Sequence, residues 1–169
     1  INAAVVAGFT LTSAVAYLAW QRRSVTAEGA LAGIGLGTAL FAAAGVRGLA
    51  VLFGFFVSST LLGRIRRRRR EALALSDVTA KGDRRDSIQV LANCGVGLLS
   101  AILYAATSEG LFFLAFAVSF AAATADTWAG EIGVLNPGSP VSILSLRPVA
   151  AGISGGVSLL GFLSSFLGA

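Results

Sequence analysis

The chain of 169 residues has no His and only one Cys, and these two absences exclude whole classes of chemistry. Without His there is no imidazole base and no His-ligated metal, and a single Cys excludes an intrachain disulfide and a multi-Cys zinc site. Charge is also scarce, since 12% of the residues are charged, against roughly 25% in ordinary soluble domains. With 56% hydrophobic residues and a mean hydropathy of +0.82, the composition excludes a soluble enzyme. Carboxylates, amides, hydroxyls, Lys and Arg remain as the groups available for chemistry.

Long apolar stretches fill most of the sequence. A membrane-spanning helix needs about 20 mostly apolar residues, because each residue advances about 1.5 Å through a hydrocarbon core about 30 Å thick. Six stretches fit and predict an all-α, polytopic helical bundle that forms a single transmembrane domain over residues 1–169. The expected spans are residues 3–20, 25–44, 49–62, 88–106, 111–125 and 149–168.

Lys and Arg set the expected orientation of these spans. If loops 63–87 and 126–148 are cytoplasmic, twelve of the 13 Lys and Arg residues lie inside and Arg47 alone lies outside. This predicts an amino terminus outside the cell. A secretory signal is the alternative for the first span, but a signal has basic residues before its apolar stretch, and here Arg22 and Arg23 follow it.

The most conspicuous charge run is the five arginines of residues 66–70. We interpret it mainly as a topology anchor that also attracts anionic membrane lipids. No aromatic residues are interleaved with the arginines, and the segment is tied to the bilayer, so we expect no nucleic-acid partner.

A polar stripe begins at the entry to the fourth expected span. At 100° per residue, one helix face about 100° wide carries six residues: Asp83, Asp86, Gln89, Asn93, Gly97 and Ser100. Carboxamides below the headgroup level are costly unless they face the bundle interior, so the stripe should line a cavity or a helix contact. Interhelical hydrogen bonding would explain it, but Lys81, Arg84 and Arg85 at its mouth favour an anionic ligand.

A second polar cluster holds Asp126, Thr127 and Glu131 at the cytoplasmic end of the fifth expected span. Five helical steps separate the two carboxylates by about 140°, so they converge only if the backbone breaks near Gly130. If it does, the two carboxylates, Thr127 and a substrate phosphate would suit Mg²⁺. The alternative is a pair of solvated carboxylates at the edge of a loop. Trp128 fits an interfacial aromatic anchor.

The start of the last expected span is rich in glycine. Gly155 and Gly156 would offer free backbone N–H groups at a helix amino terminus, with Arg147 just upstream, which together would cradle a phosphate. Gly152 and Gly156 also form a small-xxx-small pair, which predicts close helix packing equally well.

Three ordered motifs carry a resemblance to a known family. They are RDSIQVLAN at residues 85–93, ADTWAGEIG at 125–133 and VAAGISGGVSLLG at 149–161, preceded by FFVSS at 55–59. In this combination the chain resembles the integral-membrane family of plant phytyl-phosphate kinase, long catalogued as a domain of unknown function. The chain departs from the expected pattern at Gly130, where Ser is expected, and at Ile153, where Thr is expected. Family members continue past residue 169, and this chain lacks Met, so we expect a longer protein with a further span.

The resemblance implies an Mg²⁺-dependent kinase that transfers a phosphoryl group from a nucleoside triphosphate, expected to be CTP, to an isoprenoid monophosphate such as phytyl or geranylgeranyl phosphate. Catalysis would fall to Arg85, Asp126 and Glu131, and Mg²⁺ would be held by Asp126 and Glu131. The substrate-binding residues would be Lys81, Asp86, Gln89, Asn93, Thr127, Arg147, Gly155 and Gly156.

Positioning and charge neutralisation dominate phosphoryl transfer, so a chain without His can perform it. We expect the site on the cytoplasmic face of a prokaryotic cell membrane, and a homo-oligomer remains open. A transporter or flippase of an anionic lipid or small anion is the alternative, but the outer half offers only Arg47 and Glu109 and the chain shows no internal repeat. A lipid-binding or assembly subunit is a third option.

Overall fold

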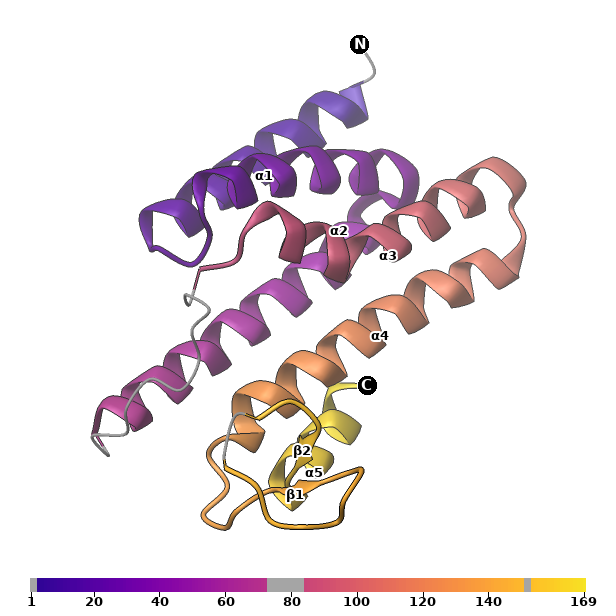
Figure 1. Ribbon diagram of the computed structural model, residues 1–169. Coiled ribbons are helices and arrows are strands. Elements are labelled where there is room, and N and C mark those ends of the chain that lie inside the picture. The colour runs from indigo at the N-terminus through magenta and orange to yellow at the C-terminus, as the bar shows by residue number, and fades with distance from the viewer. Residues whose placement is uncertain (1–2, 73–83, 151–152) are drawn as a thin grey trace. The chain divides into compact units, whose positions relative to one another are not determined.

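The computed structural model describes residues 3–72, 84–150 and 153–169, with the side chains of residues 4 and 69–72 left out. In these ranges the chain forms helices and one short two-stranded antiparallel sheet (Figure 1). The elements are α1 (Ala3–Gln21), α2 (Ala27–Ala72), α3 (Ser87–Thr107), α4 (Gly110–Gly133), β1 (Val141–Ser142), β2 (Gly156–Val157) and α5 (Leu159–Gly168). The expected helical architecture is confirmed, with the small sheet as an addition.

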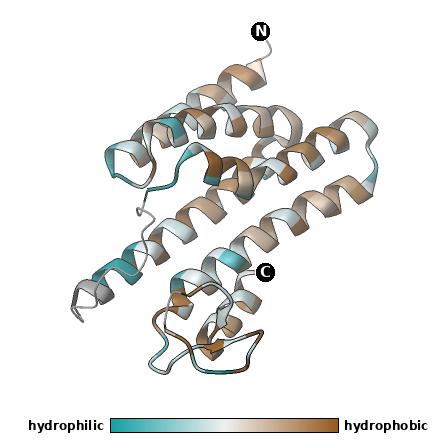
Figure 2. Ribbon diagram, viewed as in Figure 1, coloured by the Kyte–Doolittle hydropathy of each residue, from teal (hydrophilic) through white to brown (hydrophobic). Residues whose placement is uncertain are grey.

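Three helices of the described residues are long and apolar enough to cross a membrane: α2, α3 and α4. Figure 2 shows apolar residues along α3 and α4, and polar residues at the end of α2. Large apolar side chains such as Ile88 and Leu111 are more than two-thirds exposed, as suits a surface that faces lipid rather than water. Six spans and an outside amino terminus remain predictions.

The chain forms two compact units. Unit 1 comprises residues 1–56 and 83–120, and unit 2 comprises residues 57–82 and 121–169. Both α2 and α4 therefore contribute to each unit.

In unit 1 the long helix α2 reverses direction at Gly45, as the spacing of the expected spans 25–44 and 49–62 predicts. Gly45 has φ 61° and ψ −152°, a conformation that glycine adopts without a steric penalty. A Cβ added at Gly37 would lie 3.5 Å from Leu52 Cδ2, so the two parts of α2 pack side by side. Leu40, which is fully buried, and Leu49 lie on either side of the reversal and belong to the core of unit 1.

In unit 1 a tight turn joins α3 to the start of α4. Ser108 takes a left-handed conformation after α3, and its N–H donates to Tyr104 O at 2.8 Å, so α4 can begin at Gly110. A Cβ at Gly97 would clash with the ring of Phe120, so this glycine lets α4 approach α3. The gap between the expected spans 88–106 and 111–125 falls at this turn.

Unit 2 departs from the expected boundaries. Helix α4 continues through Gly133, beyond the expected end at residue 125, so residues 126–133 are helical and not part of a loop. Helix α5 begins only at Leu159, because β2 precedes it. Ser158 caps the helix, since its Oγ accepts from Gly161 N at 3.1 Å. In the described residues before Leu159 the expected span 149–168 was wrong, because residues 156–157 form β2, and α5 occupies Leu159–Gly168.

Small residues hold α5 against α4 in unit 2. A Cβ at Gly133 would lie 3.1 Å from Gly161 Cα, and a Cβ at Gly168 would lie 3.2 Å from Ala125 Cα. The two contacts run in opposite chain directions, so α5 packs antiparallel to the end of α4. Ser158 Oγ also donates to Gly133 O at 3.0 Å, which fixes the start of α5 at the end of α4.

Candidate functional sites in the two units

In unit 1, backbone hydrogen bonds hold Arg85 between the turn that follows α1 and the start of α3. Arg85 N donates to Ser24 O at 3.2 Å, and Thr26 N donates to Arg85 O at 3.0 Å. A Cβ at Gly29 would clash with Arg85 O, so this glycine allows α2 to approach the segment closely. The side chain of Arg85 thus starts from a well-defined backbone position.

Asp86 and Gln89 form a capping box at the start of α3. Asp86 Oδ1 accepts from Gln89 N at 2.8 Å, and Gln89 Oε1 accepts from Asp86 N at 3.2 Å. Each side chain thereby satisfies a backbone N–H that the first helical turn would leave unpaired. The described contacts of these two predicted substrate ligands explain how α3 begins.

The polar stripe faces the interior of unit 1, as predicted from its spacing. Asp86, Gln89 and Asn93 are half-buried, and Gly97 and Ser100 are buried. Asp83 and Lys81 lie outside the described residues. Within the stripe, Asp86 and Gln89 therefore cap the helix and Asn93 lines a pocket. Gly97 packs against the neighbouring helix α4.

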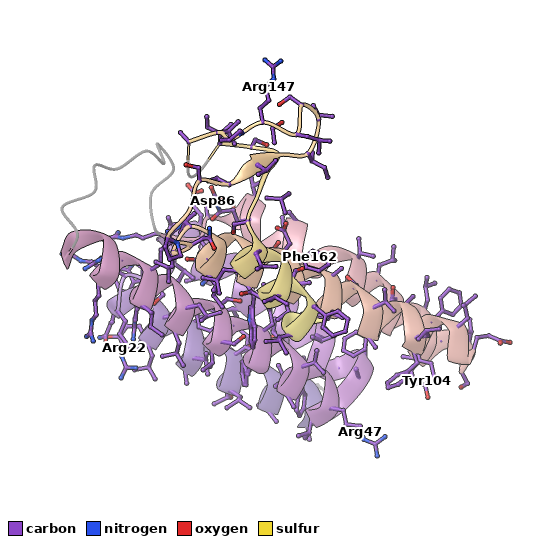
Figure 3. All side chains as sticks on the ribbon, turned by 90° about the horizontal axis from the view of Figure 1, so that it is seen from below. Arg22, Arg47, Asp86, Tyr104, Arg147 and Phe162 are labelled. Carbon is purple, nitrogen blue, oxygen red and sulfur yellow. The ribbon has the colours of Figure 1, made fainter. Side chains whose placement is uncertain are left out.

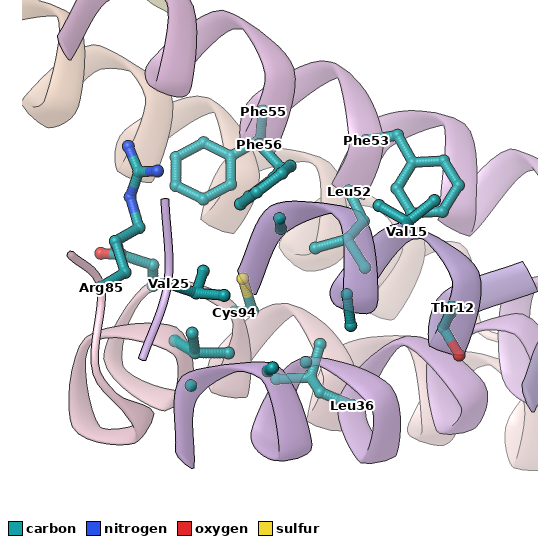
Figure 4. A pocket seen from close by; sticks show the side chains of 17 residues that line it. Thr12, Val15, Val25, Leu36, Leu52, Phe53, Phe55, Phe56, Arg85 and Cys94 are labelled. Carbon is teal, nitrogen blue, oxygen red and sulfur yellow. The ribbon is translucent and has the colours of Figure 1, made fainter. Parts of the chain in front are cut away.

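An apolar pocket that is open to its surroundings lies in unit 1 (Figure 4). One face of α1 lines it, with the i, i+3, i+4, i+7 spacing of Thr12, Val15, Ala16 and Ala19. Both parts of α2 and the first turns of α3 complete the wall. At about 1.5 Å per residue, the pocket follows α1 for roughly 10 Å.

Among the lining residues that the structure describes, Arg85 is the only charged one. Figure 4 shows it at one end, near Val25, Phe56 and Cys94, with Thr12 toward the other end. Its guanidinium carbon lies 5.8 Å from the centroid of the Phe56 ring, within the range of a cation–π interaction. In apolar surroundings a cation attracts an anion more strongly than it does in water, so this end of the pocket favours an anionic group.

At the other end of the pocket, hydroxyl groups connect α1 to α2. Thr12 Oγ1 and Thr38 Oγ1 lie 3.1 Å apart, so one hydroxyl can donate to the other while the accepting hydroxyl donates to a carbonyl of its own helix. Thr12 is only 3% exposed. Its polar atom is thus satisfied within the protein, and the adjoining part of the pocket is suited to an apolar chain.

In unit 2, Arg66 and Glu131 form an ion pair between α2 and α4. Arg66 Nε lies 3.1 Å from Glu131 Oε2, and each side chain is 17% exposed. The N–H group is not aligned on the carboxylate as a hydrogen bond requires, so the contact is ionic. A Cβ at Gly63 would lie 3.6 Å from the same carboxylate oxygen, which places Glu131 beside a glycine as well as a cation.

Thr127 and Trp128 lie close to Glu131 on α4. Trp128 Nε1 donates to Ser58 Oγ of α2 at 3.3 Å, and Thr127 Oγ1 donates to Ala123 O at 2.8 Å. Trp128 is predicted as an interfacial anchor, and this contact gives it a packing role between helices as well.

Asp126 is exposed and does not join this group. Convergence with Glu131 depends on a break near Gly130, but α4 is continuous through Gly133, so about 140° separate the two carboxylates. Within the described ranges no three His, Cys, Asp or Glu residues come together as metal ligands. The residues therefore do not fit a preformed two-carboxylate magnesium site.

Gly155 and Gly156 belong to a β-turn region instead of a helix amino terminus. Gly155 has φ +79°, and its carbonyl accepts from Ile143 N at 2.9 Å. Gly156 lies in β2, and its N–H donates to Ile153 O at 3.1 Å. The expected amino-terminal cradle is therefore not formed by the Gly156 N–H. Gly152 lies outside the described residues, and the close helix contact is made by Gly133 and Gly161.

Arg147 is exposed beside this region, and its carbonyl accepts from Ser142 N at 2.9 Å. Figure 3 shows its side chain pointing away from the small sheet. No contact in the described part of unit 2 brings it to Glu131.

Sequence reasoning missed the particular roles of Arg66, Gly63 and Phe56. Gly63 and Arg66 stand three residues apart on α2 and share a face, a spacing that could have singled out Arg66 from its neighbours in the arginine run. Nothing in the spacing alone indicates that this face meets Glu131, because the partner is far away in the chain.

The chain matches known proteins over most of its length. It is 29% identical over 170 residues to "Protein PGR" of Arabidopsis thaliana, covering 92% of this chain and 58% of that protein. It is 29% identical over 149 residues to "Uncharacterized membrane protein MJ0933" of Methanocaldococcus jannaschii, covering 88% of this chain and 60% of the relative. It is 28% identical over 134 residues to "Uncharacterized membrane protein sll0875" of Synechocystis, covering 78% of this chain and 51% of the relative.

The chain thus spans between about half and three-fifths of the length of these relatives. No solved structure matches it. Residues 10–169 match the family described as "Integral membrane protein DUF92". The resemblance drawn from the motifs is confirmed at the level of the family, and the chain belongs to the DUF92 family of integral membrane proteins.

Proposed function

We propose that this protein is a membrane-embedded kinase that converts an isoprenoid monophosphate, such as phytyl or geranylgeranyl phosphate, into the diphosphate. The observation that carries the proposal is the pocket of unit 1, which is apolar along its length and has Arg85 as the one charged residue among its described lining residues. An isoprenoid monophosphate has the same division into a long apolar chain and one anionic end.

The pocket supports binding of the acceptor. The apolar faces of α1 and α2 would hold the hydrocarbon chain, and Arg85 would bind the phosphate through its planar guanidinium. Asn93 lines the same pocket and would orient the acceptor with its amide. The monophosphate is already deprotonated at neutral pH, so the reaction needs no strong base, which agrees with a chain without His.

The donor would be a nucleoside triphosphate with its bound Mg²⁺, and CTP is the expected nucleotide. An oxygen of the acceptor phosphate attacks the γ-phosphorus, the bond from that phosphorus to the β,γ-bridging oxygen breaks, and the nucleoside diphosphate leaves. Mg²⁺ is commonly bound by one or two carboxylates together with substrate phosphates and water. The exposed Asp126 suits this arrangement as a single carboxylate on the nucleotide complex.

Glu131 has a different part in this proposal from the one first expected. Because it is paired with Arg66, it would hold that guanidinium in place, and Arg66 would neutralise phosphate charge. Lys81, Arg147 and Thr127 remain proposed phosphate ligands, and the cytoplasmic face remains the proposed side of the reaction.

The test is a transfer assay with the purified chain in lipid nanodiscs. The chain is given Mg²⁺, geranylgeranyl or phytyl monophosphate, and CTP or ATP carrying a labelled γ-phosphate. We expect label in an organic-extractable isoprenoid diphosphate, and none when the isoprenoid alcohol replaces the monophosphate.

Binding is measured in parallel with the monophosphate and no nucleotide. Saturable binding without any transfer from any nucleoside triphosphate would reject the kinase in favour of a lipid-binding protein. Neither binding nor transfer would reject the acceptor pocket as well.

A further inference from the structure

The connection between β1 and β2 presents an apolar tip, defined here as residues 143–147. Leu144 is 94% exposed, Leu146 is 79% exposed and Ile143 is 66% exposed. Such exposure of three neighbouring large side chains is unusual in contact with water and marks an interaction surface. Arg147 is the charged residue of the tip, and Figure 3 shows it pointing outward.

The backbone N–H groups of residues 142–146 are satisfied within unit 2. Ser142 N donates to Arg147 O at 2.9 Å, and Ile143 N donates to Gly155 O at 2.9 Å. The amides of Leu144 and Ser145 both donate to Ser142 Oγ at 3.3 Å, and Leu146 N donates to Ser142 O at 2.9 Å. Five consecutive N–H groups from residue 142 to residue 146 thus have partners within unit 2.

In an ordinary surface loop, water would satisfy these amides. A loop that enters a lipid environment cannot leave N–H groups unpaired, since nothing there replaces water as a partner. The tip combines satisfied amides, exposed apolar side chains and one cation at its base, which are the features of a segment that lies in the membrane interface.

The tip is also held in one shape. Val141 pairs with Val157 and Ser142 with Gly156 in the small sheet, and Val149 N donates to Pro140 O at 2.8 Å below the tip. Leu146 takes a left-handed conformation with φ 54°, which turns the chain at the end of the tip. An already ordered tip loses little conformational freedom when it docks.

We propose that residues 143–147 insert into the lipid interface of the membrane in which the protein is embedded. Ile143, Leu144 and Leu146 enter the boundary between headgroups and acyl chains, and Arg147 binds anionic headgroups. The charge argues for lipid as the occupant, because a guanidinium next to apolar side chains complements a surface whose outer layer is anionic and whose inner layer is apolar. This proposal assigns Arg147 to a lipid headgroup instead of the substrate phosphate considered above, and Ile143, Leu144 and Leu146 take no part in the kinase proposal.

The experiment places an environment-sensitive dye on the tip. Cys94, the chain's one cysteine, is replaced by Ser, and Leu144→Cys is labelled with nitrobenzoxadiazole. Ser139→Cys is the matched control, because Ser139 is exposed, polar and in the same unit just before β1. Both proteins are reconstituted in vesicles of phosphatidylcholine and phosphatidylglycerol in equal parts, with or without brominated acyl chains.

We expect blue-shifted emission at position 144 that brominated lipid quenches, and water-like emission at position 139. In vesicles that contain phosphatidylglycerol, Arg147→Gln should lower the ratio of inserted to exposed tip about fivefold, equivalent to the roughly 1 kcal/mol that one basic residue contributes near an anionic surface. In phosphatidylcholine alone the same substitution should have little effect.

Two results would overturn the proposal. Water-like emission at position 144 would show that the tip stays in solvent. Blue-shifted emission that brominated lipid does not quench would show that the tip is covered by protein, either another segment of a longer chain or a second copy.

Discussion

The carboxylate of Glu131 lies 3.1 Å from Nε of Arg66. This contact links the motif at residues 125–133 on α4 to the arginine run at residues 66–70 on α2. Both side chains are mostly buried, so removal of one partner weakens the charge compensation of the other in a poorly solvated position. The pair therefore gives one arginine of the run a defined structural partner.

Arg66→Gln and Glu131→Gln should each destabilise the protein by about 2 kcal/mol, less than a fully buried pair would lose because some solvent reaches both groups. The double variant should be less destabilised than the sum of the two, since the two side chains interact directly and this interaction is lost only once. Thermal unfolding in detergent measures this, with Arg68→Gln on the exposed side of the same helix as the control. Strict additivity of the two substitutions would contradict the pairing.

Two glycines near the end of α4 should respond in opposite ways to alanine. A Cβ at Gly130 meets nothing within 4 Å, so Gly130→Ala should stabilise the helix by about 0.5–1 kcal/mol. A Cβ at Gly133 would crowd Gly161 Cα at 3.1 Å, so Gly133→Ala should destabilise by about 1–3 kcal/mol. Unfolding midpoints of the two variants in the same detergent make the comparison, and equal shifts would argue against the packing of α5 on α4.

The capping box separates a structural role of Asp86 from a role in substrate binding. Asp86→Ala should cost about 0.5–2 kcal/mol of stability, and Asp86→Ser should restore most of it, because Ser also caps a helix. If the role is only structural, Asp86→Ser keeps the transfer activity as well. Stability restored without activity would instead show that the carboxylate itself takes part in the reaction.

Gly29 should control the position of Arg85. A side chain at Gly29 would clash with the Arg85 carbonyl, so Gly29→Ala should displace the segment and lower acceptor binding about tenfold or more, since displacements near 1 Å can be that costly. Gly35→Ala is the matched control, because the space around Gly35 on the same helix is open. Titration with an isoprenoid monophosphate gives both affinities, and equal affinities would mean that Arg85 does not depend on this contact.

The sequence was sufficient for features that depend on local spacing. The reversal at Gly45, the turn at Ser108 and the inward-facing polar stripe on α3 all follow from glycine positions or helical periodicity. The Asp-x-x-Gln capping signal at residues 86–89 was also readable, but its residues were assigned to a ligand because the neighbouring basic residues suggested one.

Other features depend on packing between distant segments. Nothing in the spacing of α4 shows that it continues past residue 125, because Asp126 and Glu131 resemble the start of a loop when their partners are unknown. Arg66 supplies the partner of Glu131 from another helix, and Gly161 supplies the contact that Gly133 needs. The late start of α5 reflects the pairing of Gly156 with Ser142, which helical periodicity cannot anticipate.

The most direct test of the kinase proposal compares Arg85→Gln with Arg84→Gln in the label-transfer assay. The two arginines are neighbours, but Arg85 lines the apolar pocket and Arg84 is exposed and does not. We expect Arg85→Gln to lose about a hundredfold or more of the transfer to the isoprenoid monophosphate, as removal of a charge-stabilising group does, while Arg84→Gln stays within a few fold of the unsubstituted protein. Equal transfer by the two variants, at the level of the unsubstituted protein, would contradict a role of Arg85 in binding the acceptor phosphate.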